Sequence, residues 1–173
     1  MALSEVFTGA NGTLTLASED TPEGADAKAV MDAFAVQTVG RLTDVTLRVN
    51  TALKEFHEVG RRHPVSLSPG NIFIAGSVGR AFVNGALMSL LLGRGSTSAS
   101  VPEPYAQPTF SMSLQLANPA KADAVVSLVV GGVKFENWQF AMPEDEFVME
   151  SLCFRALTIG VGDAETQVTF PDA

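Results

Sequence analysis

Apolar and polar residues alternate along several stretches of this chain, a pattern typical of β-strands with one buried and one wet face. The clearest stretch runs from Thr109 to Ala117. Weaker alternation covers residues 13–16, 42–50 and 72–78. In the second of these, aliphatic side chains share one face, and Asp44, Thr46 and Arg48 share the other. The pattern predicts a mainly β domain, a β-sandwich or barrel.

Two short segments carry helical spacing instead. Thr21 is a residue type that caps helices, and Pro22 suits the first helical position. Apolar residues then recur at helical intervals, which predicts an amphipathic helix that ends near Ala35. A second helix is predicted between Asn84, as its cap, and Gly93, which suits a helix C-terminus. Both helices would flank the β domain.

The C-terminal part of the chain predicts a hairpin and a long strand. The aliphatic run Val125–Val130 is followed by Gly131-Gly132, which can turn the chain into a partner strand over residues 133–142. In that partner the apolar phase slips near Glu136-Asn137, which indicates a β-bulge. Residues 147–159 predict a strand that is apolar on both faces. Such a strand must be covered on both sides, by a helix or by another subunit.

Two polar segments interrupt these elements. Lys54–Pro69 combines charges, two prolines and a glycine, and predicts a long excursion between paired strands. Loops longer than about 12 residues inside a compact domain are usually functional or disordered. Residues 93–108 predict a surface loop, because neither flank looks self-sufficient. We therefore expect one domain over residues 1–173, with 160–173 as its C-terminal segment.

The composition is 46% hydrophobic and only 17% charged. This balance fits either a monomer with a large core or a subunit whose neighbours cover much of its surface. The formal charge of −8 disfavours static binding to DNA or to an anionic membrane, because both are negatively charged. It permits nucleic acid to slide past without sticking. No apolar run approaches the roughly 20 residues that span a bilayer.

No catalytic constellation is found in the sequence. The only histidines, His57 and His63, lie in the 54–69 excursion near Glu55 and Glu58. No cysteine joins them and their spacing matches no helical ligand pair, so loop histidines in solvent are a better interpretation than a metal site. A Ser–His–Asp mechanism would need the same histidines, and no nucleophile elbow or phosphate-binding loop is present. We expect no enzyme, no metal and no cofactor.

Cys153 is the only cysteine, so no intrachain disulfide can form. Its place between Leu152 and Phe154 predicts a buried, inert thiol. The first residues lack a basic stretch followed by an apolar core, so we expect no secretory signal and assembly in the host cytoplasm.

The order of these features resembles the major tail tube proteins of tailed phages. The stretches that carry the resemblance look like the family's strand, long loop, strand, helix and closing long strand. They are Thr43–Arg48, Lys54–Arg62, Gly70–Arg80, Ala81–Gly93 and Glu146–Asp163. The resemblance implies a β-sandwich or barrel with a flanking helix, of which six copies form a ring. Rings would stack into a hollow tube that conducts DNA, and the helix near 22–35 would be an insertion.

The resemblance also implies roles for particular residues. The excursion would contact the neighbouring ring, with Arg61 and Arg62 as its electrostatic contacts. Its candidate contact residues are Lys54, Glu55, Glu58, Arg61 and Arg62. Candidates for the wall of an acidic bore are Asp44, Thr46, Arg48, Glu136, Glu144 and Glu150. In a virion tail, the partners would be further copies of the chain and tape measure, tail terminator, baseplate and sheath proteins, with DNA passing through unbound.

Three alternatives stay open at the level of sequence. The inner tube of a contractile injection machine or secretion system would share the architecture and conduct protein instead of DNA. A monomeric β-barrel module could bind a small apolar ligand. A hydrolase built on the histidine loop has the weakest support.

Overall fold

The computed structural model describes residues 7–97, 106–118 and 121–163. The strands are β1 (Gly12–Ser18), β2 (Leu42–Phe56), β3 (Ser66–Ala81), β4 (Phe110–Asn118), β5 (Lys121–Ala141), β6 (Met149–Ala156) and β7 (Thr158–Asp163). The helices are α1 (Pro22–Phe34) and α2 (Ala86–Leu92), with short 3₁₀ turns at Gly9–Asn11 and Gly93–Thr97. The predicted mainly β fold with short flanking helices is confirmed.

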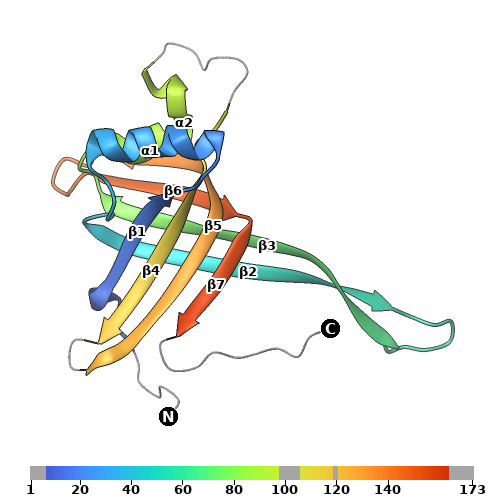
Figure 1. Cartoon of the computed structure of the whole chain (residues 1–173). Helices are drawn as coiled ribbons and strands as arrows, with labels where there is room; N and C mark the ends of the chain where they lie inside the picture. Colours follow the sequence, from blue (N-terminus) through green and yellow to red (C-terminus); the bar gives the residue numbers. More distant parts are fainter. Residues whose placement is uncertain (1–6, 98–105, 119–120, 164–173) are drawn as a thin grey trace.

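The strands are joined into one curled, antiparallel, half-barrel sheet in the order β1-β4-β5-β6-β3-β2 (Figure 1). The long strand β5 belongs to both halves of it. Its first part pairs with β4 on one edge and β7 on the other, and its second part pairs with β6. We call β1, β4, β7 and the first part of β5 the front sheet. The back sheet is the second part of β5 with β6, β3 and β2.

The prediction of a hairpin at Gly131-Gly132 is wrong, because β5 continues through both glycines as one strand from Lys121 to Ala141. Groups on both sides of β5 satisfy its backbone there: Leu157 N donates to Gly131 O at 3.0 Å, and Gly132 N donates to the Glu19 side chain at 2.6 Å. Gly132 has φ 64° and lies against the Leu157 side chain, a position where a Cβ would be 2.7 Å from that side chain. The glycines therefore mark a bend between the two sheets instead of a turn.

Other predictions for this region stand, with one change. A register shift between Phe135 and Asn137 confirms the β-bulge. The predicted long strand over 147–159 is split at Leu157 into β6 and β7, which pair successively along the same edge of β5. The strand therefore serves both sheets. Within β6, Leu152 and Phe154 are buried on the core face, and Met149 and Cys153 are half-buried on the other.

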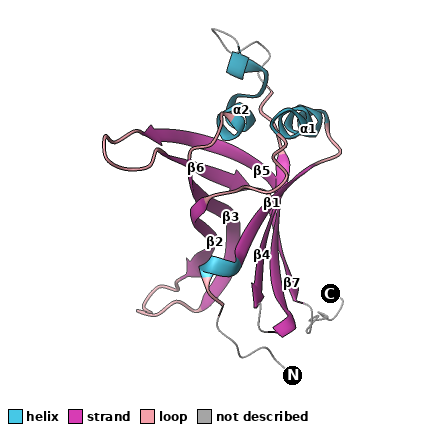
Figure 2. Cartoon of the chain, turned by 90° about the vertical axis from the view of Figure 1, so that its left-hand side faces the viewer, coloured by secondary structure: helices cyan, strands magenta, loops and turns pink. Residues whose placement is uncertain are grey.

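Both predicted helices form, and they lie next to each other on one side of the sheets (Figure 2). The Thr21 hydroxyl accepts a hydrogen bond from Gly24 N at 2.9 Å, which confirms the N-cap of α1. In α2 the N-cap position is Gly85, and the Asn84 side chain accepts from Ala86 N at 3.3 Å. Neither helix, nor any other helix in the described ranges, is long and apolar enough to cross a bilayer.

The core lies between the two sheets and under the helices. Three phenylalanines at its centre, Phe110, Phe135 and Phe154, are essentially inaccessible, and the rings of the first two have centroids 5.0 Å apart. Helices α1 and α2 contribute Ala27, Met31, Leu87 and Leu90 to the same cluster. Burial of this apolar surface is the main stabilising term for the subunit.

Candidate assembly surfaces

The most conspicuous feature is a long β-hairpin formed by β2 and β3, which projects from the body (Figure 1). The two strands pair from Leu42 and Arg80 at the base to Phe56 and Ser66 at the end. Strand β6 supports β3 only from Ile74 onward, so among the described strands nothing else pairs with the outer part of the hairpin.

The expected loop over Lys54–Pro69 is therefore too long. Residues 54–56 and 66–69 belong to the strands, and only residues 57–65 form the connection. A register shift between Thr51 and Leu53 inserts an extra residue in β3, next to Pro69, and the ladder then continues. Proline is tolerated at such an irregularity, so it did not end the strand.

One face of the projecting hairpin is apolar. Alternation along β2 puts Val49 and Leu53 on the same face as the core residues Val45 and Leu47, and their cross-strand neighbours there include Ile72 and Leu67. Leu53 is 61% exposed and Ile72 63%. We call Val49, Leu53, Leu67 and Ile72 the hairpin stripe. It continues the core face of the sheet beyond the part of the molecule that covers it.

The predicted inter-ring residues all lie at the outer end of this hairpin and are exposed. Arg61 forms an ion pair with Glu58 (Nε to Oε2, 3.3 Å), and His57 lies 3.2 Å from Glu55. Arg62 and Lys54 have no ion pair among the described residues. The end of the hairpin thus presents unpaired positive charge to solvent.

The opposite face of the back sheet is polar over residues 44–48, and Phe73 lies exposed on it further along the hairpin. Asp44, Thr46 and Arg48 lie on it, and the Thr46 and Ser77 hydroxyls are 2.7 Å apart. Cys153 pairs in register with Ser77 and is half-buried on this same face, so the prediction of a buried thiol is wrong. Its apolar neighbours in the sequence, Leu152 and Phe154, point to the other side, as strand alternation requires.

Of the three remaining bore candidates, Glu136 and Glu144 lie outside the core and Glu150 lies inside it. Glu136 is exposed and accepts a hydrogen bond from Arg155 Nε at 2.9 Å, and Glu144 is exposed in the β5–β6 turn. Glu150 is 1% exposed and points into the core, where it accepts hydrogen bonds from Arg80 Nε at 2.5 Å and Trp138 Nε1 at 2.9 Å. Glu150 therefore cannot line a bore, because its carboxylate is satisfied inside the subunit.

The back sheet has two unpaired edges. In the described structure, β2 pairs with β3 alone, so its outer edge is open over the length of the strand. At the other side of the sheet, β5 pairs with β6 over residues 134–141, whereas β4 ends its pairing at Val133. The Gln107 side chain donates to Phe135 O on this edge, so its open part covers residues 136–141. By contrast, the outer edge of β1 is partly covered by hydrogen bonds from Leu16 N to Gln37 O and from Val39 N to Leu14 O. Open edges of this length are templates for pairing with another chain.

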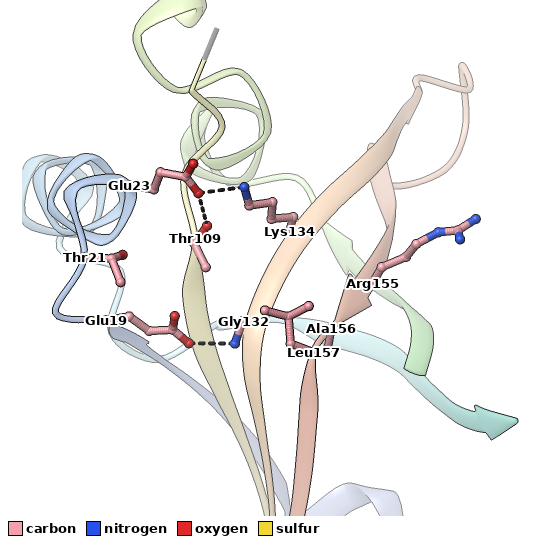
Figure 3. Close-up of a pocket in the computed structure, with 9 residues that line it drawn as sticks. All are labelled: Glu19, Thr21, Glu23, Thr109, Gly132, Lys134, Arg155, Ala156 and Leu157. Carbon is pink, nitrogen blue, oxygen red and sulfur yellow. Dashed lines mark hydrogen bonds and ion pairs between the residues drawn. The ribbon is translucent and has the colours of Figure 1, made fainter. Parts of the chain in front are cut away.

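A cavity of about 460 Å³ lies where α1 meets β5 and β6 (Figure 3). Glu23 contacts Lys134 at 2.6 Å and Thr109 at 2.7 Å, and Glu19 accepts a hydrogen bond from Gly132 N at 2.6 Å. The bond to Lys134 and the bond to Thr109 lower the pKa of Glu23. Because the chain's own groups satisfy both carboxylates, these contacts fasten α1 to the sheet. No group of three or more metal-ligating side chains is found within the described residues.

Comparison with known proteins gives a fold and no close relative. No family model and no curated protein matches the sequence. A chain of the 6-fold symmetrised anti-feeding prophage baseplate matches with a TM-score of 0.61 and 10% identity, over 96% of this chain and 100% of that one. The sheath/tube terminator of an extracellular contractile injection system, PVC, gives 0.63 and 8%, over 93% and 99%. The SPP1 tail tube gives 0.59 and 10%, over 91% and 80%. The chain therefore has the tail-tube-like fold that the sequence predicted.

Proposed function

We propose that this chain is a structural subunit of a tail tube, in which copies close into a ring by pairing their open edges. The observation that carries the proposal is the pair of unpaired edges on the back sheet, the outer edge of β2 and residues 136–141 of β5. If the first edge of one copy pairs with the second edge of its neighbour, the back sheets join around the ring and both of these edges are paired. By analogy with the family, six copies form the ring, and its role is structural instead of catalytic.

The two faces of the back sheet suit the two sides of such a ring. The core face is covered by the front sheet and the helices of the same subunit, so the polar face is free to line the bore. Its charged side chains include Asp44 and Glu136, balanced by Arg48 and Arg155. The expected acidic bore becomes a mixed one, rich in hydroxyls and amides. A wall without a positive field offers phosphates little attraction, so DNA would slide.

The same wall would serve the inner tube of a contractile injection machine, which conducts protein. In both cases we propose that the subunit works in a particle tail, beside terminator, baseplate and, where the tail contracts, sheath proteins. Two of the similar structures are of such parts, a baseplate and a sheath/tube terminator.

Negative-stain microscopy of the purified protein over a range of concentrations tests the proposal. We expect rings of uniform bore, and tubes at high concentration. A monodisperse monomer at the highest concentration would count against the proposal and for a monomeric binding module.

Two neighbouring proline variants then test the edge itself. Arg48 and Val49 are adjacent in β2, so their N–H groups point to opposite edges of the strand. One proline therefore removes a bond inside the hairpin and weakens the monomer, and the other removes a donor from the open edge. We expect the variant that lacks the donor on the open edge to keep the melting temperature of the monomer but to form no rings. If both variants form rings as the unmodified chain does, β2 is not the ring edge.

A further inference from the structure

The back sheet has a second bare apolar region, at the end opposite the hairpin. It lies where β3 and β5 end and before β6 begins. Its members are Phe82, Val83, Phe140, Met142 and Phe147, which we call the end patch. Phe147 is 84% exposed and Met142 74%, and the rings of Phe82 and Phe140 meet edge to face with centroids 5.1 Å apart. An exposed aromatic cluster of this kind marks an interaction site.

Phe140 of the end patch lies on the same face of the same ladder as the hairpin stripe. Phe140 pairs with Glu150, and Glu150 with Arg80, all on the core-facing side. The hairpin stripe continues that side beyond Ile74 at the other end of β3. The subunit covers the middle of this face, where the Arg80–Glu150 pair is buried, and both ends of the face carry exposed apolar side chains. Figure 1 shows the hairpin and the β5–β6 turn at opposite ends of the molecule.

The charges at the two ends are complementary. Next to the end patch, Glu144, Asp145 and Glu146 form an exposed acidic turn, and none of them has an ion pair in the described part of the chain. At the end of the hairpin, Arg62 has no ion pair with a described residue, and Arg61 forms its ion pair with Glu58. Contact between two acidic turns, or between two hairpin ends, would bring like charges together, which costs free energy. Charge therefore favours contact of the hairpin of one copy with the end patch of another.

We propose that the hairpin of one subunit docks on the end patch of a subunit in the next ring. The hairpin stripe covers the aromatic cluster, and Arg61 and Arg62 lie against the turn 144–146. This inference rests on the proposed function and deepens it by naming the receiving surface. Because the two surfaces differ and lie at opposite ends of one ladder, the contact is head-to-tail and does not close on itself. It would extend a stack of rings without limit, as a tube requires.

Charge exchange tests this contact. The tip variant is Arg61→Glu with Arg62→Glu, and the turn variant is Glu144→Arg with Glu146→Arg. Each alone should still form rings, but should need about tenfold more protein to stack, because like charges then face each other across the contact. The chain that carries all four changes should stack like the unmodified protein, and so should a mixture of the tip and turn variants. The matched control for the tip variant is Lys28→Glu with Arg94→Glu. It makes the same charge change as the tip variant, on exposed side chains of α1 and of the turn after α2.

Cross-linking gives a second readout that needs no stacking measurement. In a Cys153→Ser background, Arg62→Cys combined with Asp145→Cys should give a ladder of disulfide-linked chains on oxidation, and either cysteine alone should not extend beyond a dimer. Rings from the unmodified chain, with no ladder and no rescue by the four changes, would overturn the inference and leave the proposed function standing. Absence of rings at every concentration would instead refute the proposed function.

Discussion

The buried ion pair between Arg80 and Glu150 makes a quantitative prediction about stability. The side chains of Arg80 and Glu150 are 3% and 0% exposed, and their closest approach is 2.5 Å. The guanidinium also donates to the Asn84 backbone oxygen at 3.2 Å, and the carboxylate accepts from Trp138 at 2.9 Å. Both charges are thus removed from water and satisfied only by each other and by neutral groups.

The perturbation is Glu150→Gln, which keeps the shape but removes the negative charge and one of the two acceptor oxygens. Removal of one partner of a buried pair leaves an uncompensated charge and costs about 3–5 kcal/mol. Since the amide oxygen of glutamine can still accept from Arg80, we expect the lower end of that range, about 3 kcal/mol. For a domain of this size the melting temperature should fall by roughly 6–12 °C.

The assay is urea unfolding of the monomer followed by fluorescence of Trp138, the only tryptophan, at concentrations too low for assembly. The matched control is Glu136→Gln, which breaks the exposed pair with Arg155 and should cost no more than about 1 kcal/mol. If both substitutions cost the same, the reasoning about burial is refuted. Replacement of both buried partners, Arg80→Met with Glu150→Leu, should recover most of the loss.

Two further predictions concern the subunit alone. Gly76→Ala should destabilise it by about 1–3 kcal/mol, because a Cβ would clash with the Thr46 backbone oxygen and lie 2.5 Å from the Phe154 ring. Gly160→Ala, with nothing within 4 Å, should change the unfolding free energy by less than about 0.5 kcal/mol. The pKa of Glu23 is lowered in the fold by its bonds to Lys134 and Thr109, so its contribution should be complete above the ordinary glutamate pKa and be lost as the pH falls through the lower folded value. Glu23→Gln should flatten this part of the stability-against-pH curve, and an unchanged curve would contradict the assignment.

Strand alternation was sufficient to predict the class of fold and the positions of several elements. Helix α1 was predicted with its cap because Thr21 and Pro22 act locally. The hairpin at Gly131-Gly132 was wrong because a diglycine is a turn signal only when the flanking strands pair with each other. Here β4, β6 and β7, distant in sequence, hold both sides of β5. That competition is tertiary, so a local pattern does not contain it.

The position of Glu150 could have been predicted, since it is in phase with the buried residues Leu152 and Phe154. Its acidic surroundings in the sequence suggested solvent instead. The partner that stabilises its buried charge is Arg80, which lies 70 positions away in the sequence. Nothing in the sequence around Glu150 identifies this partner. A charged residue in phase with a buried strand face is therefore a signal of a buried ion pair, although only the topology supplies the partner.

The location of the exposed apolar residues favours one of the two explanations that composition left open, a subunit whose neighbours cover part of its surface. A monomer with a large core would scatter its few exposed apolar side chains over the surface. Here most of the large exposed ones lie on the hairpin beyond Leu47 or in the end patch. The strands of the hairpin keep their alternation beyond Ile74, where pairing with β6 ends. They therefore keep an apolar face in a region where the rest of the described chain does not cover it. Order of this kind, without an internal partner, is what a surface built for a neighbouring copy requires.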